Sequence, residues 1–181
     1  MIPSFFIKSL PAKTSVFFLN ASVFLFSPIA LPWLPLHHFF PYIGFTILQS
    51  SFAVSMWSAS LIGLFYDLVF GSFSGVFSYT HLLVSATAYR YRDHFFDDSP
   101  LSFSLFVSLY SLLFSLMLPL ISFVISGKQT TLFSEGILGA ILSALIDGAF
   151  AFLCFSLAPF LLALRSLLFR SLTLKKRTLY D

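Results

Sequence analysis

Charged side chains are scarce in this chain. Only 9% of its 181 residues are Asp, Glu, Lys or Arg, whereas 58% are hydrophobic. Soluble domains carry about 25% charged residues, and a small soluble domain buries too little of its surface to hide so large an apolar fraction. The composition therefore excludes a soluble globular fold. We expect an all-α, polytopic membrane helix bundle that forms a single domain over residues 1–181.

Cysteine and recognisable chemical motifs are also nearly absent. Cys154 is the only cysteine, which excludes an internal disulfide and a cysteine-based metal cluster. We find no nucleophile–base pairing, no glycine-rich phosphate loop and no set of metal ligands, so we expect no enzymatic activity, no cofactor and no metal. The net charge of +3 does not come from a basic face; we therefore expect no nucleic-acid partner.

Long uncharged stretches dominate what is present. A membrane-spanning helix needs about 20 apolar residues. Asp67 alone interrupts the stretch 39–89, which is too long for two spans and fits three. Polar residues at 49–51 blur the boundary between the first two of these three. The six expected spans, the first of them uncleaved, cover residues 15–36, 39–55, 57–70, 75–91, 101–126 and 136–164.

The positions of Lys and Arg predict the orientation of these spans, because short cytoplasmic loops collect basic residues. Lys8 and Lys13 precede the first span, and Arg90 and Arg92 follow the fourth. The segment 165–181 is a basic tail after the last span. Four spans precede Arg90 and Arg92, and six precede the basic tail. Because both numbers are even, all the basic groups lie on one side of the membrane, and we expect both chain ends in the cytoplasm. The pair His37–His38 then falls in an outer loop, where we expect an interfacial role and no metal.

Two acids lie in or beside apolar stretches. Asp67 has Gly63 and Gly71 four residues to either side, so the three share one helix face. Glycine lets a second backbone approach closely, and Asp67 would then accept hydrogen bonds from that neighbour. His81, on the next span, is the candidate partner.

Asp147 has a similar setting in the last expected span. Gly139, Ser143 and Asp147 follow one another at intervals of four residues and share one face. An acid at the centre of a spanning helix costs about 2.5–3.5 kcal/mol on insertion scales. Three interpretations of the two acids are open: each fixes helix packing, each belongs to a proton or ion relay, or the acid lies at the membrane interface.

A 30-residue segment, residues 63–92, reads GLFYDLVFGSFSGVFSYTHLLVSATAYRYR. It resembles the MreD family of bacterial rod-shape-determining membrane proteins, in which an Asp-Leu pair lies between spaced glycines and an apolar span leads to Ala-Tyr and a basic loop. The matching positions in this chain are Gly63, Asp67, Leu68, Gly71, Ser72, Gly75, Ala88 and Tyr89.

The resemblance implies a non-enzymatic role in the cell inner membrane, within the cell-wall elongation complex that maintains cell shape. It implies association with an MreC-like membrane protein and, through that protein, with MreB and the peptidoglycan synthases. The family is also thought similar in fold to the substrate-binding subunits of vitamin transporters. A small membrane transporter, or a vitamin-binding subunit of one, is the alternative, suggested by the two intramembrane acids.

Overall fold

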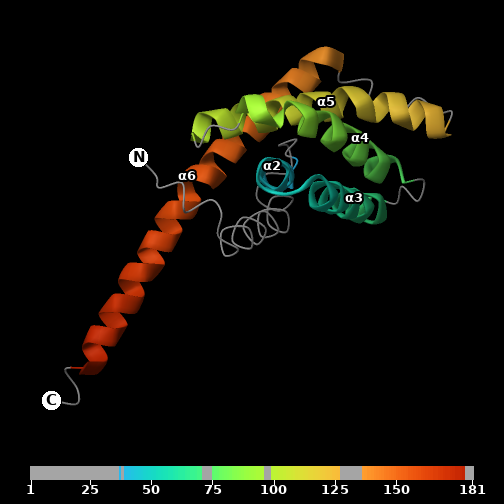
Figure 1. Cartoon of the computed structure of the whole chain (residues 1–181). Helices are drawn as coiled ribbons and strands as arrows, with labels where there is room; N and C mark the ends of the chain where they lie inside the picture. The colour runs from blue at the N-terminus through green and yellow to red at the C-terminus, as the bar shows by residue number, and fades with distance from the viewer. Residues whose placement is uncertain (1–36, 38, 71–74, 96–98, 127–135, 178–181) are drawn as a thin grey trace.

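The computed structural model describes residue 37 and the ranges 39–70, 75–95, 99–126 and 136–177, with side chains described as far as residue 156. Every regular element in these ranges is a helix, and no strand occurs among them (Figure 1). The α-helices are α2 (Phe40–Gln49), α3 (Phe52–Val69), α4 (Val76–Tyr91), α5 (Pro100–Ser126) and α6 (Gly136–Arg177), with a 3₁₀ turn, η2, over Arg92–Phe95.

Three of the described helices are long and apolar enough to cross a membrane. They are α3, α5 as far as Ile125, and the part Gly136–Ser156 of α6. The described part of the chain is thus an all-helical membrane bundle, as its composition predicts. The expected first span, 15–36, lies outside the described residues, and the count of six spans stays a prediction.

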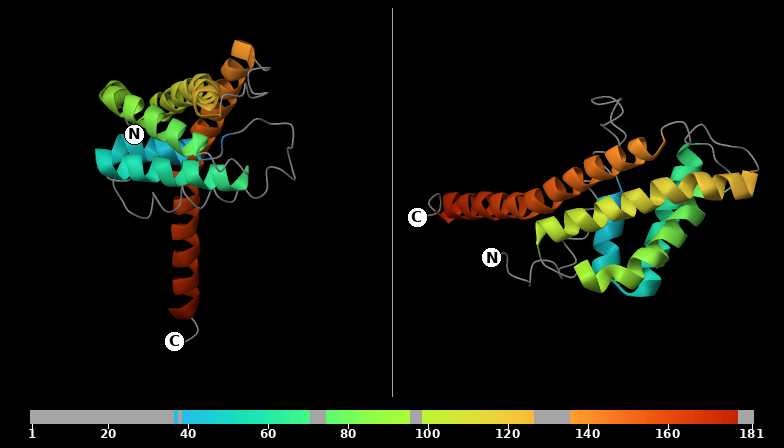
Figure 2. Two further views of the ribbon diagram at one scale, coloured as in Figure 1. Left: turned by 90° about the vertical axis from the view of Figure 1, so that its right-hand side faces the viewer. Right: turned by 90° about the horizontal axis from the view of Figure 1, so that it is seen from above.

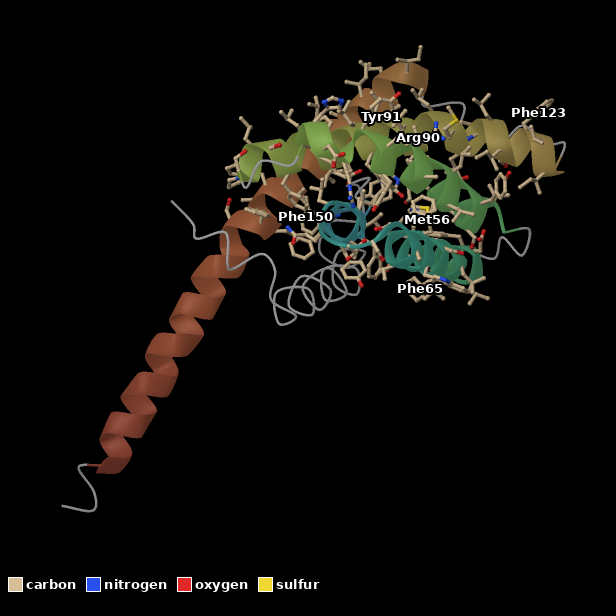
Figure 3. The ribbon with its side chains drawn as sticks, viewed as in Figure 1. Met56, Phe65, Arg90, Tyr91, Phe123 and Phe150 are labelled. Atoms are coloured by element: carbon tan, nitrogen blue, oxygen red, sulfur yellow. The ribbon has the colours of Figure 1, made fainter. Side chains whose placement is uncertain are left out.

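Large apolar side chains cover the outside of the bundle. Trp57 is 70% exposed on α3, Val124 is 81% exposed on α5, and Leu138 is 80% exposed on α6. Phe65 lies on the outer side of α3 and Phe123 lies near the end of α5, both at the periphery (Figure 3). Lipid tails match a surface of this kind, whereas water does not.

The second and third expected spans are separate helices, but the predicted boundary at residues 55–57 is wrong. Helix α2 ends at Gln49 and α3 begins at Phe52. The break falls at Ser50, whose backbone is extended (ψ 169°), and Ser51. The hydroxyl of Ser55 donates to the carbonyl of Thr46 across this break, which holds the two helix ends together. Serine favours such local bonds to the backbone over a continuous helix.

The early break leaves α2 with 10 residues, a length of about 15 Å, or half of the roughly 30 Å hydrocarbon core. This half-length helix is nevertheless central, because it contacts α3, α4, α5 and α6. Phe40, Ile43 and Ile47 on α2 are completely buried. Helix α2 therefore begins inside the bundle, where the longer helices surround its first residues.

The most extensive helix–helix contacts of the fold are those of α3 with α4 and of α5 with α6. Helix α6 begins at Gly136, as expected, but continues beyond the predicted end of the span at 164 and through most of the basic tail to Arg177. Its 42 residues extend about 63 Å. The C-terminal half projects away from the other helices in every view (Figures 1 and 2).

Arg92 joins the end of α4 to the break between α2 and α3. Its guanidinium donates to the carbonyl of Ser50 at 3.1 Å and lies 4.1 Å from the centre of the Tyr89 ring. Tyr89 in turn packs edge to face on Phe52 at the start of α3. The α2–α3 break and the basic end of α4 therefore lie on the same side of the bundle.

We predict that Arg92→Ala destabilises the protein by about 1 kcal/mol, because it removes a cation–π contact and a charged hydrogen bond at a helix end. The apparent Tm of the detergent-purified protein should fall by about 2–4 °C. Arg90→Ala, which changes an exposed residue of the same helix, is the matched control and should leave Tm unchanged. Equal effects of the two variants would contradict the assigned role of Arg92.

Candidate functional site

Asp67 caps helix α4 from the neighbouring helix α3. Its carboxylate accepts hydrogen bonds from the backbone amides of Phe77, at 3.0 Å, and Ser78, at 2.9 Å. These amides belong to the first turn of α4, where no intrahelical acceptor exists. The residue before this turn is Gly75, in a left-handed conformation with φ 70°, and it has no side chain with which to cap the helix. Asp67 supplies the missing acceptor, and its charge is favourable at the positive end of the helix dipole.

Gly63 makes this contact possible. A Cβ atom at Gly63 would lie 2.4 Å from the Cα of Ser78 and 2.8 Å from the carbonyl oxygen of Phe77. Gly63 and Asp67, one turn apart on α3, therefore act on the same two residues of α4. The structure thus shows the close backbone approach that the glycine–aspartate spacing predicts. Gly71 and Ser72, which belong to the same motif, lie outside the described residues.

The predicted pairing of Asp67 with His81 is wrong. Asp67 meets the first turn of α4, whereas His81 lies one turn further along, where α4 faces α5. Its Nδ1 lies 3.0 Å from the hydroxyl of Tyr110, which also bonds Ser85 at 3.0 Å. All three side chains are buried. Among the described residues, the Nε2 atom of His81 has no hydrogen-bond partner.

Asp147 is the centre of the second polar cluster. It is completely buried and is the twelfth residue of the 21-residue candidate span Gly136–Ser156. One carboxylate oxygen accepts the backbone amide of His37 at 2.9 Å. The other bonds the ring Nδ1 of His37 at 2.8 Å and the hydroxyl of Ser111 at 2.5 Å. Ser111 is likewise the twelfth residue of its candidate span, Pro100–Ile125.

The predicted place of His37 in an outer loop is therefore wrong. His37 lies three residues before Phe40, the first residue of the half-length helix α2, and it meets Asp147, the twelfth residue of α6, beside Ser111, the twelfth residue of α5. Its ring stacks on Phe40 at 4.4 Å and packs edge to face on Phe114 at 5.7 Å. The sequence does not predict this contact directly. The place of His37 depends on the short length of α2, and the break at Ser50 that shortens α2 lies within an otherwise uncharged stretch. The expectation for His38 lies outside the described residues.

The small residues on the same face of α6 as Asp147 lie on its inner side: Ser143 is buried and Gly139 is half-buried. The hydroxyl of Ser143 donates to the carbonyl of Gly139 within α6 itself, at 2.9 Å. The close approach of another helix occurs instead at Gly148, where a Cβ atom would meet Ser108 of α5. Ser104 of α5 donates to the carbonyl of Gly148 at 2.7 Å. The missed signal is a row of serines at 104, 108 and 111, whose spacing places them on one face of α5.

The two acids therefore have different chemical settings. Asp67 lies two residues before the last residue of α3 and accepts only backbone amides, so its role is to hold α4. Asp147 lies near the middle of its span and bonds an imidazole, which can exchange protons. No group of three or more His, Cys, Asp or Glu side chains able to hold a metal ion occurs among the residues searched, which are those described.

We predict that Asp67→Ala destabilises the protein by about 1–2 kcal/mol, the usual effect of removing a helix cap. Asp93→Ala, which removes an acid whose side chain is 83% exposed, is the matched control and should change stability little. Thermal unfolding of the purified variants measures both. A cap role for Asp67 is excluded if its loss has no larger effect than the loss of Asp93.

Glycine-to-alanine changes at 63 and 148 should differ in severity. The new Cβ at position 63 would collide with backbone atoms of α4, which cannot move without separating the helices. At position 148 the nearest atom is the hydroxyl of Ser108, which can rotate away.

We therefore expect Gly63→Ala to cost about 1–3 kcal/mol, as overpacking does, and Gly148→Ala to cost less. Ala53→Leu adds bulk to an exposed position of α3 and should be nearly neutral. Thermal unfolding again provides the measurement, and the reverse order of the two glycine variants would contradict the structure.

Comparison with known proteins adds no family to this description. No family model, no curated protein and no solved structure matches the chain. The resemblance to the MreD family therefore rests on the residues of the segment 63–92 alone, and the functional conclusions that follow rest on these residues and on the geometry of the two buried acids.

Proposed function

We propose that this chain is a non-enzymatic scaffold of the bacterial inner membrane, of the MreD type, that acts in the cell-wall elongation complex. It would associate with an MreC-like membrane protein and, through it, with MreB and the peptidoglycan synthases. Six spans, with both chain ends in the cytoplasm, are part of this proposal.

The observation that carries the proposal is that residues of the resemblance form one structural unit. Gly63, Asp67 and Gly75 lie at the same junction, where α3 meets the first turn of α4. A motif that only reflected the composition of a membrane helix would not be expected to converge on one contact. The residues of the motif thus hold α3 close against α4, an arrangement that suits the proposed scaffold.

The contact of Arg92 with Ser50 supports the proposed orientation. It brings the basic end of α4 to the α2–α3 break, and the six-span topology assigns both to the cytoplasmic side. Positive charge at this level agrees with the cytoplasmic enrichment of Lys and Arg.

The exposed face of α3 supports a partner met within the membrane. Leu61, Leu64 and Leu68 on this helix are about half exposed or more, although α3 is firmly attached to α4. In membranes, helices associate through packing and polar contacts made at such lipid-facing surfaces. A single-span protein such as an MreC-like partner could dock there without a large extramembrane domain.

A small transporter, or a vitamin-binding subunit, is the second candidate. One specific observation favours it: the half-length helix α2 starts beside Asp147, near the middle of a candidate span. Discontinuous helices that end at buried polar groups mark the substrate sites of many transporters.

Copurification with a coexpressed MreC-like membrane protein tests the proposal. We expect the wild-type chain and Asp93→Leu to capture this partner from detergent-solubilised membranes, and Asp67→Leu to capture less of it or to fold poorly. Size-exclusion chromatography of each variant separates these two effects.

Failure of the wild-type chain to capture the partner would contradict the scaffold role, as would normal capture and normal cell shape with Asp67→Leu. A vitamin recovered from the purified wild-type protein by mass spectrometry would favour the transporter subunit instead.

A further inference from the structure

The contact between His37 and Asp147 joins a titratable pair in the apolar interior of the bundle. Asp147 has no exposed surface, while the His37 side chain retains 29% of its exposure. The acid belongs to the long helix α6, whereas the histidine is a non-helical residue three positions before the start of α2. One partner is therefore held within a helix, and the other lies outside regular secondary structure.

The hydrogen bonds of the pair limit the protonation states that it can adopt. The backbone amide of His37 can only donate, and so it requires an acceptor in one carboxylate oxygen. The second oxygen lies 2.8 Å from the ring Nδ1, so a single proton between these two atoms completes the bond. Three states satisfy this bond: an ion pair, two neutral groups, and a neutral imidazole that donates its Nδ1–H to the ionised carboxylate. The first two have a net charge of zero and the third has a net charge of −1, so the apolar surroundings favour the first two, which hold one proton more.

Loss or gain of a proton would leave a net charge among apolar side chains. The rings of Phe40 and Phe114 enclose His37, and Ser111 is completely buried. An unbalanced charge in such surroundings is costly. Moving His37 toward its exposed side would relieve the cost, and this movement would detach the start of α2 from α6.

Few other groups could compensate for such a charge. Helix α2 carries no charged side chain. The titratable groups that the neighbouring helices direct toward this region are Tyr66 of α3, His81 of α4 and Tyr110 of α5, and Cys154 lies two turns further along α6. His81 packs on the same two rings, Phe40 and Phe114, as His37 does, and a second imidazole cannot supply a negative charge.

We propose that His37 and Asp147 form a proton-binding site inside the membrane bundle, and that one bound proton holds the start of α2 against α6. Release of this proton leaves a net negative charge on the pair, which weakens the attachment of the start of α2 to α6. The ligand is the proton itself, and the site is independent of the α3–α4 hairpin on which the proposed scaffold role depends.

Histidine ring NMR on the full-length protein in lipid nanodiscs tests the site. The chain has four histidines, and His37→Gln identifies the signals of residue 37. We expect Asp147→Asn to lower the pH at which His37 is half-protonated by about 1 unit or more, because the opposite charge is lost. Asp93→Asn, in an exposed turn outside the bundle core, is the control and should leave the His37 titration unchanged.

Ser111→Ala provides a second test that does not depend on the stability of the Asp147 variant. It removes one donor to the carboxylate, so the remaining charge should hold the shared proton more tightly and the half-protonation pH should rise. A purely structural role would not move the two midpoints in opposite directions. The proposal is overturned if His37 titrates at the same pH in the wild type, Asp147→Asn and Ser111→Ala. It is also overturned if the two variants shift the midpoint in the same direction.

Discussion

Lipid cannot satisfy a polar group, and this constraint explains most of the structure. Each polar side chain within an apolar span must find its partner inside the protein. Asp67 finds it in the free amides at the start of α4, and Asp147 finds it in His37 and Ser111. These bonds join segments that hydrophobic contact alone would hold weakly, because lipid tails are as apolar as the helix surfaces. The acids therefore determine which helices pack together and in what register.

The two acids solve the same problem by different chemistry. Asp67 lies near a helix end and bonds only backbone amides, which do not titrate. Asp147 lies near the middle of its span and bonds an imidazole, so its contact depends on a proton. The first arrangement suits a rigid hairpin that a partner could recognise, and the second suits a part of the bundle that can respond to its surroundings. Both arrangements are compatible with the proposed scaffold role, since they involve different helix contacts.

Much of this arrangement could be predicted from the sequence. Scarcity of charge predicts a membrane bundle, and uncharged stretches predict α4 and α5 to within one residue at each end. The spacing of Gly63 and Asp67 predicts a close approach of α4. The sequence does not predict the length of α2, because a break at two serines in an apolar stretch has no charge or proline to mark it. The place of His37 depends on that length, and so it could not be predicted either. The tight packing at Gly148 was missed because its partner row of serines lies on a helix distant in sequence.

The contact of His37 with Asp147 of α6 is the claim on which the account of the bundle interior depends. Cysteine cross-linking in native membranes measures it directly, with Cys154 replaced by alanine and cysteines introduced at positions 37 and 147. The structure predicts a rapid intramolecular disulfide for this pair and none for a control pair at positions 94 and 147, since His94 lies in the exposed turn after α4. An adjacent α5–α6 pair, such as 111 and 147, is the positive control. If this pair is oxidised and the 37–147 pair is not, the result contradicts the half-length α2 and the buried cluster built on it.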